Sequence, residues 1–308
     1  MKSNKKSISP IAIILGSILV LYSIILLLLL YWGVITAMKP NSDFIDGNNF
    51  IGFPKGKGGK LLAPWEWEFE NFLNVAKFFD LKDLVRDGRR IRSIPFFMQL
   101  IYTLMYALGC SFFATLCPCI VAYATRKFNY AFNKVIDVLV IISMSVPIIG
   151  AQASMLSLMH GLGIYDTFPG LYMQKFYFGN MYYLMFSAIF KGVSKEYYEA
   201  GYIDGATEWQ IMVKIAVPLV LTSFGLVFLL NFITYWNDYQ TLLIYAPSHP
   251  TIVYGLFKVM TDPTGSSVRG HIPVQMAGCT MITLPVITLF IIFRNKLMGN
   301  LTIGGVKE

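Results

Sequence analysis

A polar segment joins two apolar stretches in the second half of the chain, and it reads KGVSKEYYEAGYIDGATEWQIMVKIAVP at residues 191–218. Ser194 is suited to cap a first helix, and Gly205 supplies the left-handed backbone position that commonly ends one. Thr207 and Gln210 form the capping-box pattern that starts a second helix. The segment therefore predicts two helices separated by a tight turn.

The chain as a whole is strongly apolar. Of its 308 residues, 56% are hydrophobic and 14% are charged, and its mean hydropathy is +0.58. Soluble domains carry about 25% charged residues, so a soluble globular enzyme is excluded. About 20 apolar residues span a bilayer as a helix. We expect an all-α polytopic membrane protein with six transmembrane helices, at residues 8–37, 94–124, 135–158, 176–190, 215–236 and 272–293.

The basic residues of the short connections set the topology. Twelve of the 25 basic residues lie in segments that six spans place on one side, which the positive-inside rule identifies as the cytoplasm. Both termini are then cytoplasmic, and the net charge of +8 reflects topology rather than a nucleic-acid partner. The first apolar run is longer than the core of a cleavable signal peptide, so it is expected to be a retained helix.

This topology divides the chain into an N-terminal region with the first span (1–37), a long extracellular loop (38–93) and a core region (94–308) that includes the polar segment 191–218. Within the loop, five residues recur at steps of four and three and predict one face of an amphipathic helix: Trp65, Phe69, Phe72, Ala76 and Phe79. Such a helix fits the outer membrane surface or a neighbouring subunit, and a docking site for an external partner is the alternative.

The spans lack the residues that a self-powered transporter or a membrane enzyme needs. Their central parts contain no Asp, Glu, Lys, Arg or His, and the chain has no HExxH or GxSxG motif. The cysteines lie within apolar spans and are expected to serve packing: Cys110, Cys117, Cys119 and Cys279. No metal site or catalytic group is expected, so any transport requires energy from another protein.

The polar segment also carries a family resemblance. Its Glu199-Ala200-Gly201, Asp204-Gly205-Ala206, Ile215 and Pro218 resemble the Glu-Ala-Ala loop of permease subunits in bacterial ATP-binding-cassette importers, specifically the carbohydrate group and the second maltose-type permease. Trp236-Asn237, residues 163–170 and the tail at 301–307 extend the resemblance. Gly201 departs from the second alanine of the family triplet, and the first outer loop is longer than in the family.

The resemblance implies the type I importer permease fold and a multi-subunit machine in the bacterial cytoplasmic membrane. A homologous permease completes a heterodimer, an extracytoplasmic binding protein delivers a carbohydrate, and two ATPase subunits drive import. ATP and magnesium are then bound by the ATPase, and this chain, in contact with membrane lipid, binds no cofactor and is not an enzyme. The resemblance assigns ATPase coupling to Glu199, Ala200, Gly201, Asp204, Gly205, Ala206 and Pro218, and a tail contact with the ATPase to Thr302, Gly304, Gly305 and Lys307.

Polar and aromatic residues in or beside the spans are candidates for a wet substrate path: Asn180, Asn231, Thr234, Trp236 and Asn237. Hydrogen bonds between helices are the structural alternative for each of them. Asp238 and Tyr239 are candidates for contact with the binding protein. Import of a non-sugar solute and a self-sufficient carrier or channel remain the alternative functions.

Overall fold

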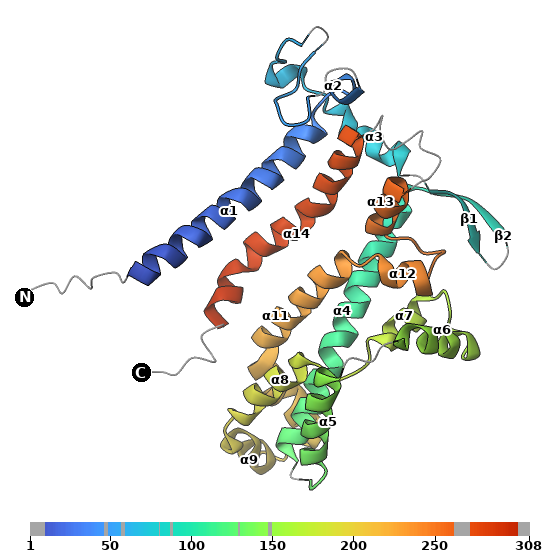
Figure 1. Ribbon diagram of the computed structural model, residues 1–308. Helices are drawn as coiled ribbons and strands as arrows, with labels where there is room; N and C mark the ends of the chain where they lie inside the picture. The colour runs from blue at the N-terminus through green and yellow to red at the C-terminus, as the bar shows by residue number, and fades with distance from the viewer. Residues whose placement is uncertain are drawn as a thin grey trace, which may run out of the picture. The chain divides into compact units, whose positions relative to one another are not determined.

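The computed structural model describes residues 10–45, 49–56, 59–79, 81–86, 89–128, 130–146, 150–261 and 272–300. These residues are mostly helical (Figure 1). The chain divides into two compact units, which are taken separately below. The first comprises Met1–Phe79 and Lys258–Leu284, and the second comprises Asp80–Phe257 and Pro285–Glu308.

Among the residues that the structure describes, four helical stretches are long and apolar enough to cross a membrane: Pro10–Ala37, Phe96–Lys127, Glu208–Trp236 and Ile272–Arg294. They correspond to four of the six expected spans. The other two expected spans are shorter than predicted. The third is divided into α5 (Asn133–Ser145) and α6 (Ala151–Gly161). Helix α5 ends because Val146, the residue before Pro147, has an extended backbone, and α6 begins after Gly150, whose φ is +83°.

The fourth expected span, at residues 176–190, is also shortened. Its helix α8 (Met181–Lys191) begins later than predicted because Asn180 caps it, accepting hydrogen bonds from the backbone N–H groups of Tyr182 at 3.0 Å and Tyr183 at 3.3 Å. A helix of 11 residues rises only about 16 Å and does not cross the roughly 30 Å hydrocarbon layer by itself.

The first unit begins with α1 (Pro10–Ala37), whose side chains are almost all exposed before residue 32. Past its end, the buried Lys39 donates from Nζ to the carbonyl oxygens of Asn49 at 2.9 Å and Phe50 at 3.2 Å. Asn71 donates to the carbonyl oxygens of Ala37 and Lys39, both at 2.9 Å. The two bonds from Asn71 satisfy carbonyl groups at the point where the chain leaves α1.

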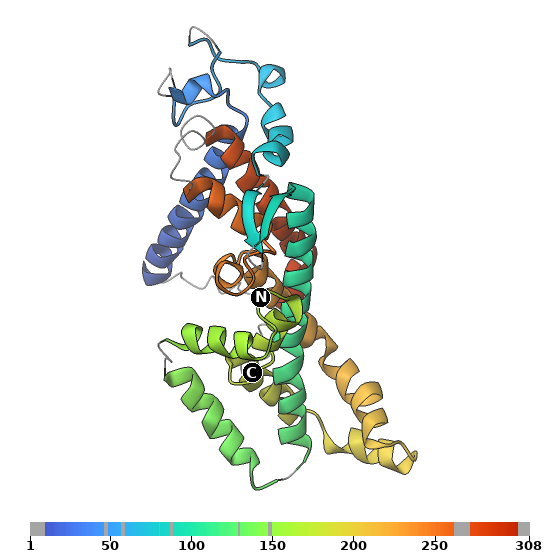
Figure 2. The same cartoon turned by 90° about the vertical axis from the view of Figure 1, so that its right-hand side faces the viewer.

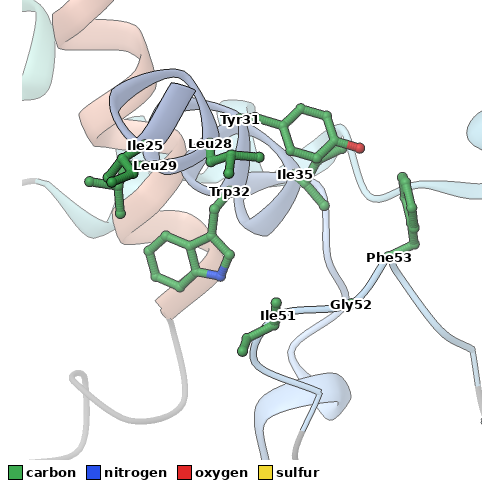
Figure 3. A pocket seen from close by; sticks show the side chains of 9 residues that line it. All are labelled: Ile25, Leu28, Leu29, Tyr31, Trp32, Ile35, Ile51, Gly52 and Phe53. Carbon is green, nitrogen blue, oxygen red and sulfur yellow. The ribbon is translucent and has the colours of Figure 1, made fainter. Parts of the chain in front are cut away.

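An apolar groove of about 380 Å³ runs along the end of α1. Figure 3 shows Tyr31 pointing toward Phe53, and the two rings meet edge to face at 6.4 Å. The indole N–H of Trp32 donates to the carbonyl oxygen of Phe50 at 2.8 Å. Trp and Tyr are enriched at membrane–water interfaces, so this end of α1 has the composition of an interfacial anchor.

The long loop of the first unit contains α2 (Ser42–Ile45), the 3-10 turn η1 (Pro64–Glu66) and α3 (Glu70–Phe78). The predicted aromatic face is correct at Phe79, which is buried, and wrong at Trp65, Phe69 and Ala76, which are exposed. Trp65 and Phe69 lie before α3 and are exposed, whereas the buried positions are Asn71, Val75 and Phe79. Phe79 is buried because its ring seats against Gly278, where an added Cβ would lie 2.4 Å from Phe79 Cζ.

The second unit starts with an antiparallel hairpin of β1 (Leu81–Arg86) and β2 (Arg89–Ile94), beside the start of α4 (Phe96–Lys127) in Figure 2. This hairpin is a small departure from the all-α prediction. Helix α4 packs along α8 and α11 (Val217–Trp236). The core between them contains Ala122, Tyr183, Phe186 and Val227. The four cysteines are free, and three of them are buried, in keeping with a packing role.

A second core of this unit gathers α6, α7 (Phe168–Gln174), α12 (Gln240–Tyr245) and the start of α13 (Ile252–Thr261) around α4. Asp166, at a positive φ of 58°, accepts hydrogen bonds from the backbone N–H of Ser248 at 3.1 Å and from its hydroxyl group. His249 Nδ1 lies 3.3 Å from the same carboxylate. These contacts fasten the turn before α7 to the connection after α12.

Candidate functional site

The polar segment forms the helical hairpin that its sequence predicts. Its first helix, α9 (Lys195–Ile203), begins after Ser194, whose hydroxyl oxygen accepts a hydrogen bond from the Glu196 N–H at 3.3 Å. Figure 1 shows α9 beyond the end of α8, at one end of the packed helices α4, α8 and α11. The capping bond satisfies one N–H group that the helix itself leaves free.

The turn after α9 depends on Gly205. This residue has φ of +75°, and the two hydrogen bonds of a glycine-capped helix end are both present: Gly205 N–H to Tyr202 O at 3.0 Å and Ala206 N–H to Gly201 O at 2.9 Å. The left-handed position costs glycine little and a β-branched residue much. The predicted turn residue is therefore the one that the backbone requires.

The second helix starts with the expected capping box. The Gln210 N–H donates to Thr207 Oγ1 at 3.3 Å, and the Thr207 N–H donates to Gln210 Oε1 at 2.8 Å. After the short α10 (Glu208–Ile211), the chain makes a π-helical turn over Met212–Ala216 and continues as α11. Pro218 accounts for this wide turn, because its ring collides with the carbonyl group four residues earlier.

Gly201 lets the two helices of the hairpin approach closely. It is buried, and a Cβ at this position would lie 2.9 Å from Ile215 Cδ1 and 3.2 Å from Ile211 Cγ1. These isoleucines project from the second helix and the π-helical turn. The ends of these isoleucine side chains occupy the space that a methyl group would take, so an alanine at this position would require them to shift slightly.

The opposite surface of the hairpin is exposed. Glu199, Ala200 and Asp204 lie on it, and so do two large apolar side chains that the sequence analysis missed, Ile203 at 87% and Trp209 at 69% exposure. The sequence does indicate them, because each is an apolar residue next to the polar turn, one on either side. A rigid hairpin that presents two apolar side chains beside two carboxylates has the character of a protein-docking surface.

A cavity of about 450 Å³ opens between this hairpin and the ends of α4 and α8. Its lining includes Glu199 and four basic residues: Arg126, Lys127, Lys191 and Lys195. Arg126 is held by Asp137 of α5 at 2.6 Å, and Asp137 also accepts a hydrogen bond from the Tyr183 hydroxyl at 2.7 Å. This network fixes the ends of α4, α5 and α8 around the cavity.

The candidate path residues make structural contacts. Asn180 caps α8, as described above, and the buried Asn231 donates to Thr115 Oγ1 across to α4 at 3.0 Å. Thr234 and Asn237 are exposed but bond back to carbonyl groups of their own helix, at 2.9 Å and 2.8 Å. Trp236 is buried and its ring lies 5.6 Å from that of Phe232. Asn180 and Asn231 thus use their side chains at separate places in the unit.

Two further candidates also have internal partners. Asp238 accepts hydrogen bonds from the Tyr106 hydroxyl at 2.7 Å and the Thr241 N–H at 3.0 Å. Tyr239 stacks on Phe257 with ring centroids 4.5 Å apart. The tail residues Thr302, Gly304, Gly305 and Lys307 lie outside the described residues.

Comparison with known proteins identifies the class. Residues 114–298 match the family described as the binding-protein-dependent transport system inner membrane component. This match covers more than half of the chain and includes the hairpin, so the protein belongs to that family. The predicted recognition, a permease subunit of an ATP-binding-cassette importer, is confirmed.

Individual relatives agree with this assignment. The chain is 26% identical to the arabinooligosaccharides transport system permease protein AraQ of Bacillus subtilis, over 74% of this chain and 79% of that protein. It is also 26% identical to the trehalose transport system permease protein SugB of Mycobacterium tuberculosis, over 81% and 93% of the two chains.

Among solved structures, a bacterial ABC transporter involved in the import of the acidic polysaccharide alginate matches with a TM-score of 0.70. The match covers 94% of this chain and 99% of the other, at 18% identity. At that identity the similarity concerns the fold, and it confirms the predicted type I permease fold.

Proposed function

We propose that this protein is the permease subunit of an ATP-driven carbohydrate importer. In this proposal it forms the translocation path together with a homologous permease, receives a sugar or oligosaccharide from an extracytoplasmic binding protein, and is driven by two ATPase subunits. The chain itself carries no catalytic role, and ATP and magnesium belong to the ATPase subunits. Both termini and the α9–α10 hairpin face the cytoplasm of a bacterial cell.

The observation that carries the proposal is the hairpin itself. Its shape is held by a capped start, a glycine turn and a capping box, all of which resist bending. Its exposed surface combines Ile203, Trp209 and Glu199. A rigid, partly apolar knob is suited to seat in a groove of another protein, where apolar anchors contribute affinity and a carboxylate pairs with a basic partner.

Coupling then follows from rigid-body movement. When two ATPase subunits close on ATP, each moves the knob that is seated in it, and the helices attached to the knob move with it. In this chain the hairpin continues through the π-helical turn into α11, which packs along α4. A displacement at α9 is therefore passed into helices long enough to cross the membrane.

The carbohydrate assignment rests on the relatives. Both curated proteins compared above are described as sugar permeases, one for arabinooligosaccharides and one for trehalose. Their shared class supports a sugar or oligosaccharide substrate for this chain, whereas their different substrates leave the particular sugar open. The candidate path residues Thr234 and Asn237, which are exposed, are the first positions at which to seek sugar contacts.

The test is purification of the tagged full-length protein from its native membrane in a gentle detergent, followed by mass spectrometry and an ATPase assay. We expect recovery of a second permease and a nucleotide-binding subunit. Uptake of radiolabelled arabinotriose, maltotriose, trehalose and a non-sugar control, such as a dipeptide, in cells with and without the chain then assigns the substrate class.

Two outcomes would overturn the proposal. Recovery of the chain alone, with transport after reconstitution of the purified chain, would identify a self-sufficient carrier or channel. Recovery of the ATPase with loss of only dipeptide uptake in the deletion strain would keep the importer and remove the carbohydrate.

A further inference from the structure

We propose that Lys127 is a positioning residue that fastens the α9–α10 hairpin to the end of α4. This inference rests on the proposed function, because it concerns how movement of the hairpin reaches a membrane-crossing helix. Lys127 is the last residue of α4, and its side chain is only 5% exposed. Such deep burial of an ammonium group requires compensating partners.

One partner is a carboxylate of the hairpin. Lys127 Nζ donates to Glu208, which occupies the first turn of α10 directly after the cap. Glu208 also accepts a hydrogen bond from the Tyr202 hydroxyl of α9. Its negative charge suits the helix N-terminus, so one carboxylate joins α4, α9 and α10.

The remaining partners are aromatic rings. Lys127 Nζ lies 5.6 Å from the centroid of Tyr123 and 5.4 Å from that of Phe128, both at the end of α4. It lies 5.3 Å from Tyr198 and 5.2 Å from Tyr202, both of α9. A cation within about 6 Å of a ring centroid is attracted to the ring, and the attraction strengthens where water is excluded.

The arrangement is therefore a four-ring cage around one charge, with two rings on each side of the junction between α4 and the hairpin. We define these four residues and Lys127 as the lysine cage. It differs from an ion pair between two exposed side chains, because the Lys127 side chain is only 5% exposed and its ammonium contacts Glu208 and the rings of Tyr198 and Tyr202 together, beside the cavity described above. The cage is suited to transmit a displacement of α9 directly to α4. This contact adds to the connection of the hairpin to α11 through the backbone.

The test measures local opening and nucleotide response in the purified full complex by hydrogen exchange and mass spectrometry. The variants are Lys127→Met, which removes the charge, Lys127→Arg, which keeps it, and Lys134→Met as a control at an exposed lysine of α5. Each is compared without nucleotide and after trapping with ATP and orthovanadate. The ATPase subunit recovered with each variant is quantified in parallel.

We expect Lys127→Met to accelerate exchange at residues 195–211 about tenfold, a factor typical of coupling between neighbouring elements. The nucleotide-dependent change at residues 119–128 should be lost, while ATPase recovery and the change at 195–211 persist. Lys127→Arg should restore both behaviours, and Lys134→Met should match the wild type. A purely structural role would lower ATPase recovery and raise exchange throughout the unit.

Unchanged exchange at 195–211, or a retained response at 119–128, in Lys127→Met would overturn the inference. Should that variant fail to accumulate, Glu208→Gln removes the ion pair at an exposed position and is expected to act in the same direction. Absence of any ATPase from the wild-type preparation would instead defeat the proposed function. The comparison without nucleotide would still test whether Lys127 fastens the hairpin.

Discussion

Replacement of Gly205 by valine is the sharpest perturbation of the hairpin. The backbone at this position has φ of +75°, and an added Cβ would meet nothing within 4 Å. The cost of a side chain is therefore conformational and not a packing clash. A left-handed position costs an ordinary residue about 1–2 kcal/mol, and a β-branched residue at such a position costs up to about 3 kcal/mol.

That cost falls on a short element. Helix α9 has nine residues, and the turn at its end includes the hydrogen bonds that the Gly205 and Ala206 N–H groups donate to the Tyr202 and Gly201 carbonyl oxygens. A destabilisation of about 1.4–3 kcal/mol lowers the population of the native turn relative to an opened turn by about 10- to 150-fold. If the turn at Gly205 is only marginally stable in the wild type, the variant rarely forms it, and docking of the α9–α10 hairpin is lost.

The assay is uptake of the transported sugar in cells, with membrane abundance of the tagged chain and co-purified ATPase measured in the same samples. We expect Gly205→Val to keep its membrane abundance and to lose uptake and ATPase recruitment. Gly205→Asn is the matched control, because asparagine tolerates the left-handed region and should retain most uptake. Normal uptake by Gly205→Val at normal abundance would refute the reasoning.

Three further predictions concern other parts of the chain. Gly201→Leu should lower the free energy of unfolding by about 1–3 kcal/mol through overpacking against Ile211 and Ile215, and it should reduce ATPase recruitment. Gly201→Ala requires only a small shift of the Ile215 end, so the amount of ATPase that co-purifies with each variant compares the two. Burial lowers the pKa of Lys39, and the nearby Asp43 partly offsets this shift. Between the lowered and the ordinary pKa values the unfolded chain binds more protons than the folded chain, so the stability of the folded chain rises with pH in that range. Lys39→Met should flatten this rise in melting curves recorded in detergent at several pH values. Removal of residues 300–308 should lower sugar-stimulated ATP hydrolysis by the complex, and an unchanged rate would assign no coupling role to the tail.

The sequence predicted the parts of the site that depend on neighbouring residues. Ser194, Gly205 and Thr207 act through hydrogen bonds within a few positions, so their residue types suffice to indicate the two helices and the turn. The β1–β2 hairpin was also predictable from neighbouring residues, because Asp87-Gly88 is a strong hairpin signal between two extended runs.

The sequence could not predict contacts between distant parts of the chain. The lysine cage combines the end of α4 with rings from α9, about 70 positions later, and no local pattern connects them. Exposure of Ile203 likewise depends on which face of the hairpin packs inward, and Gly201 decides this by admitting Ile215. The ends of α5 and α8 depend on Pro147 after Val146 and on Asn180, whose residue types also occur within transmembrane helices.

The central claim is that the α9–α10 hairpin docks into the ATPase, and site-specific photo-crosslinking tests it most directly. A photoreactive amino acid is introduced at Ile203, the most exposed apolar position of the hairpin, and at Leu15 of α1 as a control for non-specific reaction. We predict a crosslink from position 203 to the nucleotide-binding subunit and none to that subunit from position 15. An assembled, ATP-hydrolysing complex with no crosslink from position 203 to that subunit would contradict the account.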